Sequence, residues 1–186
     1  DVVLWPIQFT AVGNQLEDLY NLMEQQRNKI NSFLVTKGVD AEEISYSSPA
    51  ITDKVAQQWG SNGRAEFRYT GTQTVTVYSK QVEAVRKVMN QLADLGKQGI
   101  IFTGDNYNAQ TEYIYTGLNQ IKPAMIEEAT RNAREVAEKF AQDSASRLGK
   151  IKRASQGQFS LSSRDSNTPH IKKVRVVSTV EYYLSD

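Results

Sequence analysis

Few side chains in this chain can do chemistry. Its single histidine, His170, follows the turn-rich segment SRDSNTP, and Asp165 or Asp105 are the carboxylates that could assist it in general acid–base work. A lone loop histidine is most often a solvated surface residue. Cysteine is absent, which excludes thiolate nucleophiles, Cys-ligated metals and disulfides. We therefore predict no catalytic residue, no cofactor and no metal site, and we expect a non-enzymatic protein.

Other polar clusters have simpler explanations. Asp143 and Ser144 fall at the predicted end of a helix with no base beside them, so we expect them to cap that end. Glu127 and Glu128 are neighbours on the same helix and point in different directions, which prevents a tight carboxylate pair. The GDNYN segment at 104–108 resembles a calcium loop only superficially, because it lacks the spaced acidic ligands and the closing glutamate.

A basic patch is the first candidate for binding. Two runs of cations lie on the last two predicted strands, and we expect them at the same end of a hairpin if those strands pair. Such a patch can bind an anionic lipid or an acidic partner; alternatively it is a solvated edge whose charges discourage aggregation. It lacks the aromatic residues that stack on bases, so no nucleic-acid partner is expected. The patch consists of Lys150, Lys152, Arg153, Lys172, Lys173 and Arg175.

Strand faces rich in threonine and tyrosine are the second candidate. Strict alternation places Thr72, Thr74 and Thr76 on one side of a strand, and Tyr113 and Tyr115 share a side of another. Exposed faces of this kind can be protein interfaces, although the same residues are also ordinary choices for a strand. We expect a homo-oligomer or a complex with a protein partner.

The elements that carry these residues follow from hydrophobic periodicity. A strand at 2–10 holds Pro6, which suggests an edge or a bulge. A long amphipathic helix at 14–37 starts with a capping box and ends at Gly38. The other predicted elements are strands at 44–51 and 66–79, a helix after Ser79, a loop at 97–109, a strand at 113–118, a helix with Pro123 in its first turn that Gly149 closes, and strands at 151–162 and 173–184.

These elements repeat. A strand, a long helix and two strands occur in the half 1–79 and again in the half 110–186, and a connecting helix at 80–96 joins them. Each half is a βαββ unit whose antiparallel strands can be covered by its helix. We predict an α+β fold with two such repeats, forming a single domain over residues 1–186.

Composition limits the possible classes of protein. The chain has 186 residues, 39% of them hydrophobic and 23% charged, which suits a globular fold. Its formal net charge of +1 gives no global field for nucleic acid. No apolar run approaches the ~20 residues of a membrane-spanning helix. The chain begins at Asp1 rather than methionine, so we expect that an upstream segment was removed, either a signal peptide or an anchor helix.

The last third of the chain resembles the SIMPL-domain family. Three features stand in the family's order: a helix in KPAMIEEATRNAREVAEKFAQDSASR with its LGKI exit, the strand QGQFS, and the strand VRVVSTVEYYL. Earlier in the chain, YTGTQTVTVYSKQVEAV is similar to the family's Val-Thr-Val strand and the helix that follows it. The likeness covers nearly the whole chain.

The resemblance implies a location and a mode of action. Bacterial members are usually exported or anchored cell-envelope proteins, so it implies a periplasmic protein or one anchored to the inner membrane and facing the periplasm. Some relatives are linked to oxidative-stress tolerance, and one immunogenic periplasmic member forms a large ring-like, channel-like oligomer. The family has no agreed catalytic residues, so none is transferred to this chain.

Four functions remain open on this basis. The first is a non-enzymatic envelope protein that works by self-assembly or partner binding. The second is a periplasmic protein that binds a small ligand between the two halves. The third is a kinase-associated signalling adaptor, as in the distant animal relative that gave the family its name. The fourth is an enzyme that uses His170.

Overall fold

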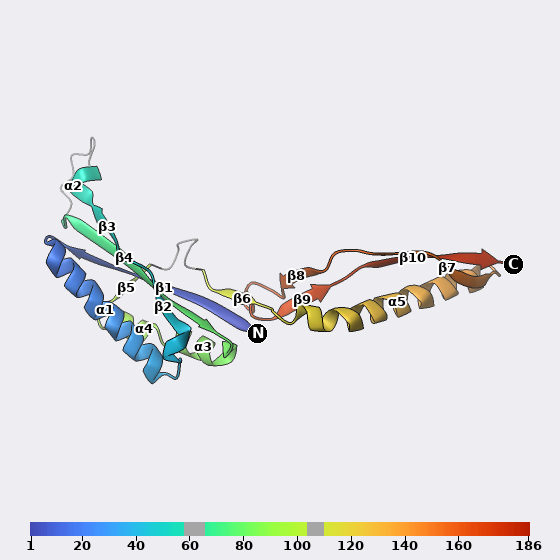
Figure 1. Ribbon diagram of the computed structural model, residues 1–186, viewed down its shortest axis with the longest axis horizontal. Coiled ribbons are helices and arrows are strands. Elements are labelled where there is room, and N and C mark those ends of the chain that lie inside the picture. The colour runs from blue at the N-terminus through green and yellow to red at the C-terminus, as the bar shows by residue number, and fades with distance from the viewer. Residues whose placement is uncertain (58–65, 104–109) are drawn as a thin grey trace. The chain divides into compact units, whose positions relative to one another are not determined.

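The computed structural model describes residues 1–57, 66–103 and 110–186 (Figure 1). The described chain forms two compact units, unit 1 at Asp1–Ile114 and unit 2 at Tyr115–Asp186. Both combine helices with antiparallel strands, which confirms the predicted α+β class. The prediction of a single repeat-built domain stays a prediction, and the two units are described separately.

Unit 1 is built on a six-stranded antiparallel sheet. Its two long strands, β1 (Val2–Gly13) and β4 (Tyr69–Ser79), pair along their whole length. The short strands β2 (Ile44–Tyr46) and β3 (Ala50–Asp53) extend the sheet on the β4 side. On the other side, β5 (Ile101–Phe102) and β6 (Glu112–Ile114) pair with β1.

Helices of unit 1 cover one face of this sheet. The long helix α1 packs across β1 and β4, and α3 packs on β1 (Figure 1). Helix α4 contributes Leu95 to the same core. The helices are α1 (Leu16–Thr36), the 3₁₀ turn η1 (Ala41–Glu43), α2 (Lys54–Gln57), α3 (Val82–Met89) and α4 (Ala93–Gly96). The predicted connecting helix at 80–96 is therefore two helices that belong to unit 1.

The core of unit 1 lies between the sheet and α1. Alternate residues of the two long strands point into it, among them Phe9 and Val75, and α1 adds Leu19 and Ile30. At roughly 25 cal/mol per Å² of apolar surface buried, this layer is the main source of the unit's stability. No described helix packs on the opposite face of the sheet, which carries the intervening residues of both strands.

Unit 2 is a helix packed on a long, interrupted hairpin. Helix α5 (Leu118–Asp143) lies along β7 (Arg147–Gln156) and β10 (Ser178–Ser185), which pair with each other. Beyond a break in the ladder, β8 (Ser160–Ser163) pairs with β9 (Lys172–Arg175). Among the described residues of unit 2, Ala141 alone is buried. A helix on two strands buries little apolar surface, and Val136, Phe140 and Leu184 are among the exposed apolar residues of unit 2.

Three prolines mark places where the structure differs from the predicted elements. Pro49 interrupts the strand predicted at 44–51, because it has no N–H to donate, and β2 and β3 form on either side of it. Pro123 lies inside α5 rather than in its first turn, because the helix begins at Leu118, which was assigned to a strand. Pro6 was expected at an edge or a bulge, and β1 is an inner strand. It lies between the stretches of β1 that pair with β5 and β6.

The start of α1 and the end of α5 differ from their predictions, whereas the end of α1 agrees. Asn14 does not cap α1. Its side-chain oxygen instead accepts a hydrogen bond from the backbone N–H of Arg68 at 3.0 Å. Gly38 follows α1 with a φ of 94°, as expected for a residue just past a helix. Gly149 does not close α5, which ends at Asp143; it lies in β7, where a Cβ would meet the carbonyl oxygen of Tyr183 at 2.9 Å.

Candidate functional site

The carboxylate of Asp165 holds the loop before β9. It accepts backbone hydrogen bonds from Asn167 at 2.9 Å and Thr168 at 2.7 Å, and side-chain bonds from Thr168 and Arg164. These bonds, the Thr168 hydroxyl first, lower the pKa of Asp165 to about 2. His170 lies half-buried in the same loop. The carboxylate is thus committed to the loop, and Asp105 lies outside the described residues.

Replacing the Thr168 hydroxyl tests this arrangement. Thr168→Val should raise the pKa of Asp165 from about 2 toward its ordinary value of 3.8. Because the pKa is depressed in the folded chain, the carboxylate stabilises the loop above about pH 4 and loses that effect as the pH falls through 2. A carboxyl-carbon NMR titration measures the midpoint, with Ser166→Ala as the control. An unchanged midpoint in Thr168→Val would contradict the assignment.

The remaining polar clusters have structural partners. Ser144 donates its hydroxyl hydrogen to the carbonyl of Phe140 at 2.9 Å, at the end of α5. Asp143 forms an ion pair with Lys139 at 2.7 Å. Glu127 and Glu128 lie exposed on α5. Within the described residues, no three His, Cys, Asp or Glu side chains gather as a metal site would require. The GDNYN segment lies outside the described residues.

The predicted tyrosine and threonine faces separate in the structure. Thr72, Thr74 and Thr76 lie on the side of the unit 1 sheet that no described helix covers. Tyr113 instead packs against the core on the helix side, with its hydroxyl 3.9 Å from the sulfur of Met89. Tyr115 lies beyond the end of β6. The prediction that Tyr113 and Tyr115 form an exposed strand face is therefore wrong, because β6 is too short and its register turns Tyr113 inward.

The two basic runs also lie apart. Arg153 is opposite Glu181, whereas Arg175 is opposite Ser160, roughly 20 Å further along the hairpin. Lys150 and Lys152 accompany Arg153 on β7, and Lys172 and Lys173 accompany Arg175 on β9. The antiparallel pairing of the strands thus places the runs toward opposite ends of the hairpin, and they do not form one patch.

The β9–β10 edge, the open side of residues 172–185, is the most distinctive surface of unit 2. No described strand pairs with it. The opposite edge, on β7, carries Arg147, Lys150, Lys152 and Arg153, and such charges discourage strand addition. The β9 end of the β9–β10 edge carries Lys172, Lys173 and Arg175, but from 176 to 185 the edge has one charged residue, Glu181, among valine, threonine, serine, tyrosine and leucine. This edge is therefore suited to pair with another strand.

A groove runs beside this edge. It has a volume of about 550 Å³, and residues 175–180 form one wall while Ala129, Ala133 and Val136 of α5 contribute to the other. Val136 is 57% exposed, and Phe140, one turn further along α5, is 69% exposed. An incoming strand would cover this apolar surface.

Ser178 lies at the middle of the edge with an unsatisfied hydroxyl. Its Oγ is buried and has no hydrogen-bond partner among the described residues. A buried polar atom without a partner costs about 1–3 kcal/mol. Arg175 and Glu181 lie three positions before and after it and are both exposed. The edge therefore has opposite charges placed symmetrically about a hydroxyl that lacks a partner.

Comparison with known proteins identifies the family. The chain matches the model of the SIMPL family, described as "Protein of unknown function (DUF541)", over residues 1–182. It belongs to this family, as its sequence resemblance predicted. A comparison with curated proteins finds no significant match. In the described part of the chain, no helix is both long enough and apolar enough to cross a membrane.

Proposed function

We propose that this SIMPL-family protein is non-enzymatic and acts by self-assembly, in which the β9–β10 edge of one copy pairs with the same edge of a second. The observation that carries the proposal is the unpaired edge, with one charged residue between 176 and 185, beside the groove that Ala129, Ala133 and Val136 help to line, in a unit that buries only Ala141 among its described residues. A unit that leaves so much apolar surface exposed is typical of one that is completed by a partner.

The partner is a second copy because the edge complements itself. In antiparallel pairing about a twofold axis at Ser178, Arg175 of each copy lies opposite Glu181 of the other. Val176 and Val180, which both face α5, come opposite each other in the same way. The two Ser178 residues lie opposite each other at the axis, but each Oγ is buried within its own copy, so the register rests on the charged pairs and the valine pairs.

Helix packing supports the same geometry. Each α5 packs on its own hairpin, so a shared four-stranded sheet would place the two helices on one face, separated by two strand spacings, or about 10 Å. Packed helices have interaxial distances of about 8–10 Å. Val136 and Phe140 then face the helix of the other copy, which covers their exposed side chains.

The cell envelope is the proposed location of this assembly. The family resemblance supports a periplasmic protein or one anchored to the inner membrane, with a contribution to oxidative-stress tolerance. An assembly of paired copies is a scaffold rather than a catalyst, which agrees with an Asp165 carboxylate that is committed to its own loop.

The solution mass of the chain tests the proposal. Multi-angle light scattering on a sizing column, across a concentration series, should give a mass of at least twice the 20.9 kDa of one copy. The mass should fall when Val136 is replaced by lysine, because an ammonium group would enter the covered apolar surface. Tyr78→Lys in unit 1, where Tyr78 is 51% exposed, is the matched control and should leave the mass unchanged. A monomer at every concentration would refute the proposal.

A further inference from the structure

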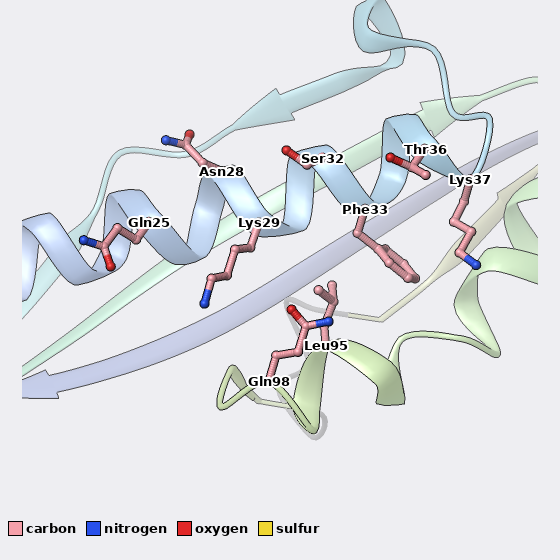
Figure 2. Close-up of a pocket in the computed structure, with 9 residues that line it drawn as sticks. All are labelled: Gln25, Asn28, Lys29, Ser32, Phe33, Thr36, Lys37, Leu95 and Gln98. Atoms are coloured by element: carbon pink, nitrogen blue, oxygen red, sulfur yellow. The ribbon is translucent and has the colours of Figure 1, made fainter.

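A second feature, in unit 1, has the form of a ligand site. The groove between α1 and α4 has a volume of about 660 Å³, within the range of small-molecule pockets. Phe33 and Leu95 form its apolar base. Lys29 of α1 and Lys37, the residue that follows α1, lie on either side of Phe33 (Figure 2). The other lining residues are uncharged: Gln25, Asn28, Ser32, Thr36 and Gln98.

The charge of this groove is positive and unbalanced. No carboxylate lines it, and neither Lys29 nor Lys37 has an ion-pair partner among the described residues. Lys37 lies over the ring of Phe33, with its Nζ 5.8 Å from the ring centre. Asp94 on α4 is already paired with Lys97 at 3.4 Å. The groove therefore has two ammonium groups beside an apolar surface, and a bound anion could pair with either of them.

The polar lining can also take part in recognition. Lys29 lies on α1 and Lys37 is the residue directly after its end, eight positions further along, so their Cα atoms are roughly 12 Å apart along the helix axis. Ser32 and Thr36 of α1 also line the groove, and Gln98 approaches from the α4 side (Figure 2). A bound molecule would thus meet a cation at either end, hydroxyl and amide groups along its length, and an aromatic ring and Leu95 beneath it.

We propose that this groove binds a small organic anion with an apolar body. The anionic group bonds to an ammonium of Lys29 or Lys37, and the body covers Phe33 and Leu95. The groove lies within unit 1, whereas the sequence analysis expected a ligand between the two halves. The site does not depend on the pairing of β9–β10 edges, so either proposal can fail alone.

Binding of 2-naphthoate tests this proposal. We expect saturable binding by isothermal titration calorimetry, with NMR shifts concentrated at Lys29, Phe33 and Gln98. The double variant Lys29→Gln/Lys37→Gln should bind at least about tenfold more weakly, because neither position then offers the ammonium group that makes the charge-assisted hydrogen bond. The neutral analogue 2-naphthamide should bind wild type and variant alike. Light scattering of the double variant should give the wild-type mass.

The matched control removes two lysines elsewhere in unit 1. Lys80→Gln/Lys87→Gln makes the same change in net charge outside the groove, and it should leave naphthoate binding unaltered. If naphthoate binding were weakened equally in both double variants, the cause would be the change in net charge, and the proposal would be overturned. The absence of naphthoate binding would also overturn the proposal. The proposal would fail in the same way if an acidic peptide shifted the NMR resonances of the groove residues and naphthoate did not.

Discussion

Glu181→Arg should raise the dissociation constant of the assembled chain about 30-fold. In the proposed pairing, Glu181 lies opposite Arg175 of the other copy, and the twofold axis makes this contact twice. Cross-strand ion pairs contribute roughly 0.2–1 kcal/mol each, and like charges at such positions are destabilising by a similar amount. Reversal at two sites therefore amounts to roughly 2 kcal/mol, read as the shift in a light-scattering concentration series.

Reversing the charge of the proposed partner, Arg175, tests whether the effect comes from this one contact between copies. Arg175→Glu alone should weaken assembly to a similar extent, and Arg175→Glu/Glu181→Arg should restore it. Within one copy the two residues are six positions apart on one extended segment, about 20 Å, so they cannot rescue each other in the same chain. Rescue must therefore act between copies.

A control separates this effect from contacts within the chain. Glu181 also approaches Lys152 of β7, with 4.0 Å between the charged atoms and both side chains more than half exposed. Exposed pairs of this kind contribute little. Lys152→Gln removes that contact alone and should leave assembly unchanged. If the doubly reversed variant stays as weak as either single variant, the Ser178 register is wrong.

Unit 1 was largely predictable because its patterns are local. The alternation in β4 that separates Thr74 from Val75 determines which side of the strand faces the core, and the structure agrees. Leu19, Met23 and Ile30, at helical spacing in the predicted amphipathic helix, are buried residues of α1. In both elements one face is buried and one is open, which is the condition under which hydrophobic periodicity is informative.

Unit 2 was less predictable because it has almost no buried core for its hydrophobic periodicity to mark. With Ala141 alone buried, apolar residues such as Val136 and Phe140 do not mark an inner face of the described unit. Arg153 and Arg175 were expected to lie together, and their separation required the register of β7 with β10 and of β8 with β9. Register depends on pairing between distant segments, which the spacing of one strand does not reveal.

Both candidate sites needed tertiary information of this kind. The spacing of Lys29, Phe33 and Lys37 places them on one stripe of α1 and is readable from the sequence. The position of Leu95 beside that stripe is not readable from the sequence, because Leu95 and α1 are brought together by the tertiary fold. Similarly, the low charge of residues 176–185 is a visible signal, but the absence of a described strand beside them is a property of the fold.

The stability of unit 2 should depend on its association with unit 2 of a second copy. If pairing covers Val136, Phe140 and the β9–β10 edge, the stability of unit 2 includes the free energy of association and rises with protein concentration. The twofold geometry also closes on itself, since each copy has one such edge. The smallest assembly that satisfies it is a dimer.

The most direct test of this account is a disulfide at the proposed twofold axis. The chain has no cysteine, so Ser178→Cys introduces one thiol per copy. Opposite residues of antiparallel strands have Cα atoms about 4.5–5.5 Å apart, within the range that a disulfide spans. Ser155→Cys, on the charged β7 edge, is the matched control.

Mild oxidation should convert Ser178→Cys almost completely to a covalent dimer on a non-reducing gel, while Ser155→Cys stays mostly single-chain. Reduction should reverse the product. If Ser178→Cys stays single-chain at concentrations where light scattering shows assembled protein, the copies do not meet at this edge, and the proposed mode of assembly is wrong.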